Sequence, residues 1–209
     1  RRARGPTGRL KPATTTTGRA KPPTTTTGRA KPRTTSLTKP AATKAASRAA
    51  SPLVVLKLGG ELLDQPGDVD RVARAIVALN TRSALVVVHG GGKEIDAALA
   101  TAGIPKQQVD GLRVTDAPTL DVVVSVLAGA INTRLVAAIR RGGGRPVGLT
   151  GADATVATMK KAAPITTVSG ERVDLGLVGA PVANGAPTLI TDLVAGGYVP
   201  VIACIGATR

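Results

Sequence analysis

The chain has 209 residues, 28 of them basic and 13 acidic, for a net charge of +15. Its single cysteine, Cys204, excludes a disulfide framework and a multi-cysteine zinc site. No apolar run approaches the ~20 residues that a membrane span requires, so we expect no membrane partner. Residues 1–52 hold 13 of the basic residues and no acidic one, so the charge belongs to a tail and a nearly neutral domain follows it.

The tail repeats with a ten-residue period: GRLKPATTTT (8–17), GRAKPPTTTT (18–27) and GRAKPRTTSL (28–37). A segment of one charge sign with recurrent proline buries too little surface to fold, so we expect residues 1–52 to be disordered. Three purposes stay open: a solvated or incidental extension, an organelle targeting peptide, or a non-specific binder of nucleic-acid phosphates. We expect a cytoplasmic protein, or one of an organelle stroma or matrix if the tail is a transit peptide.

Strands and helices alternate after the tail. An apolar run over 53–58 stops at Gly59 and Gly60, which predicts a buried parallel strand and a glycine turn. The further predicted elements are a helix over 68–79 with Asp68 as its N-cap, a strand over 84–88 ending at His89-Gly90-Gly91-Gly92, a helix with Ile95, Ala98 and Leu99 on its apolar face, a long helix over 118–139 capped by glycines 142–144, a strand over 146–151, a hairpin region over 165–182, a helix over 188–195 and a strand over 198–205. This order predicts an α/β three-layer sandwich around a largely parallel sheet.

Both glycine clusters follow strands, and open α/β sheets bind ligands at the carboxyl ends of their strands. Glycine lets backbone N–H groups converge on an anion, and a helix N-terminus adds positive charge. Lys57 adds a full charge, and a lysine in a buried strand is costly unless an anion meets it. The pattern therefore indicates a phosphate or carboxylate site, with plain tight turns as the alternative. Neither a dinucleotide-binding G-x-G-x-x-G nor a P-loop is present.

Seven strings of the folded part form a pattern in a fixed order and spacing: KLGGELL (57–63), VVVHGGGKEID (86–96), VDGLRVTDAPTLDVV (109–123), LAGAINTRLV (127–136), VGLTGAD (147–153), VDLGLVG (173–179) and GGYVPVIACIGAT (196–208). This pattern resembles that of acetylglutamate kinases, which belong to the amino acid kinase family. The GLRVTD string separates this resemblance from aspartate, uridylate, carbamate and glutamate 5-kinases. The resemblance runs from about Leu53 to the last residue and implies the amino acid kinase fold.

The resemblance implies a phosphotransferase of arginine biosynthesis that transfers phosphate from ATP, with Mg²⁺, to the side-chain carboxylate of N-acetyl-L-glutamate. That carboxylate is already ionised at pH 7, so no general base is needed. By the family pattern Lys57 stabilises the transferring phosphoryl group, and the pattern implies no protein-held metal site. The other implied residues are Gly59, Gly60 and Gly91 for phosphate oxygens, and Gly91, Gly92 and Arg113 for the substrate, with Arg113 forming a bidentate pair with the α-carboxylate.

Three further expectations concern single features. We interpret His89 as a residue that holds its turn in shape and not as a general base, and Cys204 as a small buried hydrophobe. The helix over 118–139 resembles the one at the homodimer interface of the family, with ordinary core packing as the alternative.

The sequence stops at IGATR, where the family pattern continues into an ATP-binding lobe. We therefore expect residues 53–209 to form the amino-terminal, acetylglutamate-binding lobe of a truncated enzyme, with little or no activity alone. The alternative is a non-catalytic module that senses acetylglutamate or binds nucleic acid through the basic tail.

Overall fold

The computed structural model describes residues 52–63, 66–183 and 187–208, so the predicted tail over 1–52 lies outside the described residues apart from Pro52. A four-stranded sheet carries the fold, in the order β1-β2-β10-β5, and all its neighbours are parallel. The strands are β1 (Leu53–Leu58), β2 (Ala84–His89), β5 (Pro146–Thr150) and β10 (Val199–Ala203). Because β1 and β2 end side by side, at Leu58 and His89, the two glycine turns start from one edge of the sheet.

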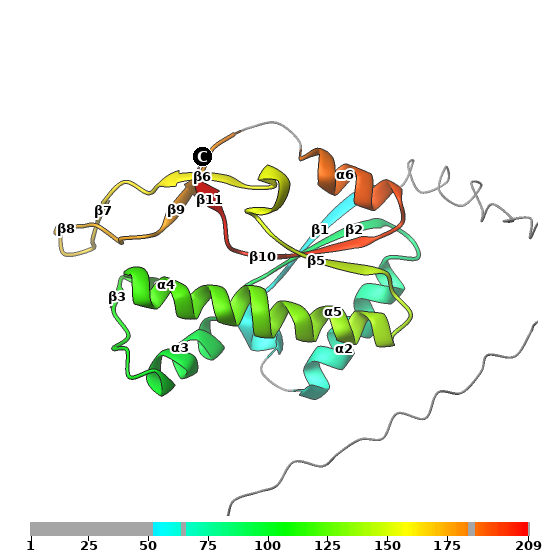
Figure 1. The fold of residues 1–209 in the computed structure, drawn as a ribbon, viewed down its shortest axis with the longest axis horizontal. Helices are drawn as coiled ribbons and strands as arrows, with labels where there is room; N and C mark the ends of the chain where they lie inside the picture. The colour runs from blue at the N-terminus through cyan, green and yellow to red at the C-terminus, as the bar shows by residue number, and fades with distance from the viewer. Residues whose placement is uncertain (1–51, 64–65, 184–186, 209) are drawn as a thin grey trace, which may run out of the picture. The chain divides into compact units, whose positions relative to one another are not determined.

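Helices cover both faces of this sheet, as Figure 1 shows. On one face lie α2 (Pro66–Leu79), α3 (Gly92–Thr101) and the long helix, and on the other lies α6 (Thr188–Ala195). The side chains between the sheet and the long helix are aliphatic and buried; they include Leu85, Val87, Leu135, Ile139, Val199 and Val201. The predicted α/β sandwich with a parallel central sheet is confirmed.

The long helix consists of α4 (Ala117–Val124), a π-helical segment η2 (Ser125–Ile131) and α5 (Asn132–Arg141). The Asp116 carboxylate caps α4 by accepting a hydrogen bond from Thr119 N over 2.9 Å, which satisfies one of the free N–H groups of the first turn. At the other end Gly142 is the C-cap and Gly143 has a φ of 87°, a conformation that favours glycine. The predicted helix over 118–139 is confirmed within two residues at each end.

The helix Ala117–Arg141 is long and apolar enough to cross a membrane by length and composition, which differs from the expectation that no such run exists. A core helix of an α/β domain passes the same test. Here Leu135 and Ile139 are fully buried among core residues, and Asn132 hydrogen-bonds to the β10 backbone. These contacts identify it as a helix of this core.

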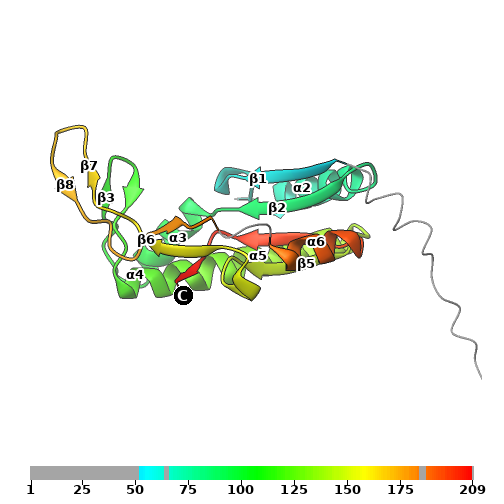
Figure 2. The same ribbon diagram turned by 90° about the horizontal axis from the view of Figure 1, so that it is seen from above.

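Small hairpins extend beyond the carboxyl edge of the sheet (Figure 2). Two of them are two-stranded antiparallel hairpins, β3 (Gln108–Val109) with β4 (Leu112–Arg113) and β7 (Ile165–Thr166) with β8 (Arg172–Val173). Beside them lies a three-stranded sheet in which β6 (Thr158–Lys161) pairs antiparallel with β9 (Gly179–Pro181) and parallel with β11 (Ala207–Thr208). Two 3-10 turns, η1 (Gly60–Leu63) and η3 (Asp153–Thr155), complete the fold. The Val168 N–H donates to the Asp110 carboxylate over 2.8 Å, so the tips of the first two hairpins are joined.

Two local predictions are wrong. The prediction of a buried strand over 53–58 is wrong, because β1 is an edge strand of the described sheet, and Leu53 and Val55 are 54% and 63% exposed. Asp68 is not the N-cap of α2, because that helix begins at Pro66. Instead, the Asp68 carboxylate forms an ion pair with Nη2 of Arg71, 3.1 Å away, within the first turns of α2.

Candidate functional site

The two predicted glycine turns touch each other at the carboxyl edge of the sheet. The Gly90 N–H donates to the Leu58 carbonyl over 3.1 Å, which joins the end of β1 to the turn after β2. A Cβ on Gly60 would lie 3.0 Å from the Gly92 nitrogen and 3.1 Å from the Gly91 Cα. The turns can therefore approach this closely because Gly60 has no side chain.

Packing, and not backbone conformation, requires a glycine at position 91. Its φ of 174° is extended and open to any residue. A Cβ there would lie 2.1 Å from Cδ1 of Ile131 and 3.0 Å from Cδ2 of Leu127, two buried residues of the π-helical segment. The long helix thus rests directly on the glycine turn.

The amino end of α3 faces this turn, with Gly91 as its N-cap and Gly92 as its first residue. Its first helical bond runs from Ile95 N to Gly91 O over 3.0 Å. The first N–H groups of an α-helix point out of its amino end and carry the positive end of its dipole. Backbone donors and positive potential therefore meet where β1 and β2 end, an arrangement that can bind an anion. We call the two glycine turns, residues 59–60 and 90–92, the anion cradle.

Arg134 of α5 hydrogen-bonds to residues beside both turns of the anion cradle. Its Nη2 donates to the Glu94 carboxylate over 2.8 Å and to the Leu63 carbonyl over 3.2 Å. Since Leu63 ends η1 and Glu94 lies in the first turn of α3, this one guanidinium connects both glycine turns to the long helix.

Lys57 lies on β1 opposite Val88, and its side chain is exposed. The prediction that Lys57 lies in a buried strand is therefore wrong, and its burial gives no support to an anion site, because β1 is an edge strand of the described sheet. Its position just before Gly59 still provides a mobile positive charge beside the turns. Cys204 is likewise exposed and not a buried hydrophobe, because it follows the last residue of β10.

Arg113 lies on β4 and is linked to the cradle through α3. Its Nη2 donates to the Asp96 carboxylate over 2.5 Å, and Lys106 donates to the other oxygen of that carboxylate over 2.6 Å. Burial alone would raise the pKa of Asp96, but the hydrogen bonds and charges of Lys106 and Arg113 outweigh it and lower that pKa. The Nη1 atom of Arg113 is buried and has no hydrogen-bond partner.

His89 is fully buried at the end of β2 and hydrogen-bonds within its own turn, which confirms the interpretation that it shapes the turn. Its Nδ1 lies 3.2 Å from the Gly90 carbonyl oxygen, and its Nε2 lies 3.1 Å from Nδ2 of Asn132. Burial lowers the pKa of the imidazole, while the bond to Gly90 and the charge of Glu94 act in the opposite direction. A neutral, doubly hydrogen-bonded imidazole suits a structural role.

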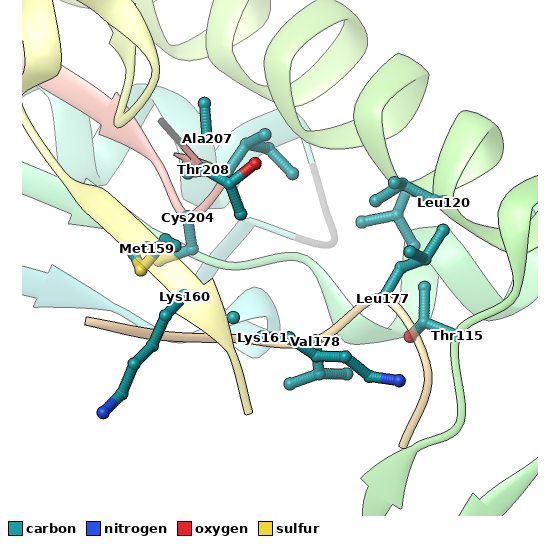
Figure 3. A pocket seen from close by; sticks show the side chains of 14 residues that line it. Thr115, Leu120, Met159, Lys160, Lys161, Leu177, Val178, Cys204, Ala207 and Thr208 are labelled. Atoms are coloured by element: carbon teal, nitrogen blue, oxygen red, sulfur yellow. The ribbon is translucent and has the colours of Figure 1, made fainter. Parts of the chain in front are cut away.

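A cavity of about 580 Å³ opens beyond β10, between α4 and the β6 and β9 strands (Figure 3). Thr115, Leu120, Leu177 and Cys204 are among its lining residues, and none of the six predicted site residues is. Lys160 and Lys161 leave β6 in opposite directions, as neighbours on a strand do. Lys161 is paired with Asp174 over 2.7 Å.

The structure brings Gly60, Gly91 and Gly92 together and ties Arg113 to them through α3, with Gly59 and Lys57 just before the turn.

Sequence reasoning missed Asp96 and Asn132. The Asp110-Gly111 pair, with φ values of 48° and 78°, is the two-residue hairpin signal that could have predicted the β3–β4 hairpin and so the position of Arg113. Among the described residues, no three His, Cys, Asp or Glu side chains form a metal-binding group.

Curated proteins with similar sequences are acetylglutamate kinases. The acetylglutamate kinase of Sorangium cellulosum (strain So ce56) is 41% identical over 174 residues, which are 82% of this chain and 60% of that protein. The acetylglutamate kinase of Methanopyrus kandleri is 42% identical over 153 residues, 73% of this chain and 57% of that protein. The chain therefore spans somewhat more than half the length of these relatives.

Two solved structures share the fold. N-acetylglutamate synthase from Neisseria gonorrhoeae, complexed with coenzyme A and N-acetyl-glutamate, has a TM-score of 0.59 at 24% identity, covering 78% of this chain and 37% of that one. The smu.665 protein from Streptococcus mutans UA159 has a TM-score of 0.60 at 22% identity, covering 75% and 60%. The family model described as the amino acid kinase family matches residues 52–209, three quarters of the sequence. The chain belongs to the amino acid kinase family.

Proposed function

We propose that this chain provides the acetylglutamate-binding lobe of an acetylglutamate kinase, a phosphotransferase that transfers the γ-phosphoryl group of ATP to the side-chain carboxylate of N-acetyl-L-glutamate. The identity to acetylglutamate kinases supports the substrate class. The observation that carries the proposal is the unpaired Nη1 of Arg113, beside a helix whose amino end lies at two glycine turns.

A buried guanidinium nitrogen without an acceptor is costly, so a ligand that supplies a carboxylate oxygen is favoured there. The ion pair with Asp96 already engages Nη2, so Nη1 is the atom left for that ligand. The expected bidentate pair between Arg113 and the substrate is therefore modified. Asp96 occupies Nη2 of the guanidinium, and the same ion pair fixes the direction in which Nη1 points. We assign the α-carboxylate of acetylglutamate to Nη1.

Phosphoryl transfer to a carboxylate requires mainly that the two substrates are positioned and that the charge on the transferring group is stabilised. An oxygen of the ionised side-chain carboxylate attacks the γ-phosphorus, a new C–O–P linkage forms, and the bond to the β-phosphate oxygen breaks to release ADP. Charge on the transferring phosphoryl oxygens is then met by Lys57 and by backbone N–H groups of Gly59, Gly60 and Gly91, while Gly92 contributes to the substrate side. Mg²⁺ enters with the nucleotide phosphates, and no residue of this chain is assigned to it.

Calorimetric titration of N-acetyl-L-glutamate into the 209-residue chain tests the proposal. Replacing Arg113 by lysine keeps the charge but removes the planar fork, so we expect affinity to fall by about tenfold or more. Arg140→Lys, on the exposed last turn of α5, is the matched control and should bind as the wild type does. N-acetyl-L-glutamine, which lacks the side-chain carboxylate, should bind more weakly. Equal affinities for the two arginine variants would contradict the assignment.

We also propose that the exposed face of the long helix mediates homodimerisation. Val124 is 37% exposed on this helix, and Gly129 faces open space. Sedimentation equilibrium should show a dimer that Gly129→Glu converts to a monomer, because a buried carboxylate at a dimer contact is costly. A wild-type chain that sediments as a monomer at micromolar concentration would contradict the proposal.

A further inference from the structure

Asn132 lies at the junction where the π-helical segment ends and α5 begins, and it is only 6% exposed. Its Nδ2 donates to the Val201 carbonyl over 2.9 Å and lies 3.1 Å from Nε2 of His89. On the far side, a Cβ on Gly148 of β5 would lie 2.2 Å from the Asn132 Oδ1 atom. The amide thus occupies a space shared by β2, β10 and β5, and Gly148 leaves room for it.

The orientation of this amide determines the protonation of His89. The Val201 carbonyl can only accept a hydrogen bond, so the atom of Asn132 that faces it must be the NH₂ nitrogen. The same nitrogen faces Nε2 of His89, which must therefore accept. A neutral imidazole that accepts at Nε2 carries its proton on Nδ1.

The Nδ1–H group then donates to the Gly90 carbonyl oxygen, 3.2 Å away. In a planar trans peptide the C=O and the following N–H point in opposite directions. Holding the Gly90 carbonyl toward the buried ring therefore turns the Gly91 N–H away from it. The other hydrogen-bonding tautomer would set two acceptors, Nδ1 and the carbonyl oxygen, against each other.

The residue before Asn132 acts on the same turn. Ile131 packs against the Gly91 Cα, in the space that a side chain at Gly91 would occupy. Two consecutive residues at the end of the π-helical segment therefore hold the turn, one by contact with Gly91 and one through His89. Segments of π-helix inside longer helices often occur at functional sites.

We propose that Asn132 is a positioning residue of the anion cradle. It selects the Nδ1–H tautomer of His89, and that tautomer directs the Gly91 N–H toward the bound carboxylate or phosphate oxygen. The ligand in this statement rests on the function proposed above. The tautomer and its control by Asn132 rest on the hydrogen bonds alone.

Because His89 is the only histidine of the chain, its imidazole can be observed without assignment. Long-range ¹H–¹⁵N correlation spectra of the ¹⁵N-labelled chain should show a neutral ring with a protonated Nδ1 and an unprotonated Nε2 at pH 7. Asn132→Leu, which removes the donor at similar volume, should give a mixture of tautomers. A protonated Nε2 in the wild type, or an unchanged spectrum in Asn132→Leu, would overturn the inference.

Two substitutions at His89 separate positioning from packing. In asparagine the amide nitrogen is as many bonds from Cα as Nδ1 is in histidine, whereas in glutamine it corresponds to Nε2. His89→Asn can keep the donor to Gly90, and His89→Gln can keep only the contact with Asn132. We expect His89→Gln to weaken acetylglutamate binding about tenfold or more, and His89→Asn to weaken it about threefold or less.

Urea unfolding of both His89 variants measures the loss of packing, which should be similar in the two. Equal affinities, or weaker binding by His89→Asn, would show that His89 only fills space and would overturn the inference. A wild-type chain that binds no acetylglutamate would contradict the proposed function, and the tautomer spectra would still decide whether Asn132 sets the state of His89.

Discussion

Replacing Gly91 by alanine is the most direct test of how the long helix fixes the glycine turn. The added Cβ would lie 2.1 Å from Cδ1 of Ile131 and 3.0 Å from Cδ2 of Leu127. Carbon atoms in contact are normally about 3.5–4.0 Å apart, so one of these groups must move by more than an ångström. Ile131 is 1% exposed and belongs to the hydrophobic core, so its movement disturbs packed neighbours.

Overpacking of this kind costs about 1–3 kcal/mol in a closely packed core. In a domain of this size each kcal/mol lowers the melting temperature by about 2–4 °C, so we expect a decrease of about 2–12 °C. Gly90→Ala is the matched control, because a Cβ on Gly90 would meet nothing within 4 Å. Differential scanning calorimetry of the two variants should separate them clearly.

A second substitution tests the specific contact. Ile131→Val removes the Cδ1 atom that the new Cβ would meet, at a cost of about 0.5–1.5 kcal/mol on its own. In the Gly91→Ala background it should restore part of the lost stability, giving a coupling energy of about 0.5–3 kcal/mol. Additive effects in this cycle, or a Gly91→Ala protein as stable as Gly90→Ala, would refute the reasoning.

Three other substitutions give further tests. Gly148→Ala places a Cβ 2.2 Å from the Asn132 Oδ1 and should lower the free energy of unfolding by about 1–3 kcal/mol in urea titrations; a neutral effect would contradict the tight enclosure of Asn132. Asp96→Asn removes the charge that holds Arg113 and should weaken acetylglutamate binding about tenfold by calorimetry, whereas an unchanged affinity would show that Arg113 needs no anchor. The hydrogen bonds from Thr119 lower the pKa of Asp116, so its stabilising effect is present above the ordinary value and is lost as the pH falls through the lower folded value. Asp116→Asn keeps a good N-cap, so stability at pH 7 should change little while the acid-dependent loss shrinks; an identical acid profile would count against the cap.

Local pattern was sufficient for most of the fold. Apolar β-branched runs over 84–88 and 198–205 became neighbouring strands of the central sheet, and the helix over 188–195 begins and ends where periodicity placed it. Glycine after two strands predicted where the turns would lie. These features depend on residues close together in the chain, so their signals survive without the tertiary structure.

Burial of β1 could not be predicted, because an apolar run reads the same in a central strand and in an edge strand. Only the pairing of strands shows that β1 has one neighbour among the described strands, and this leaves Lys57 in solvent. The exposure of Cys204 has the same origin, since it depends on where β10 ends.

The sequence by itself determined which residue types could bind an anion: a lysine, an arginine and two glycine turns at the ends of parallel strands. Tertiary structure alone decided how they are held. Asp96 meets Arg113 from 17 residues away, and Asn132 meets His89 from 43 residues away, across elements that touch only after the sheet and the long helix have packed together. Such partners leave no local signal, because a buried hydrogen bond depends on where two side chains lie and not on what surrounds each in the chain.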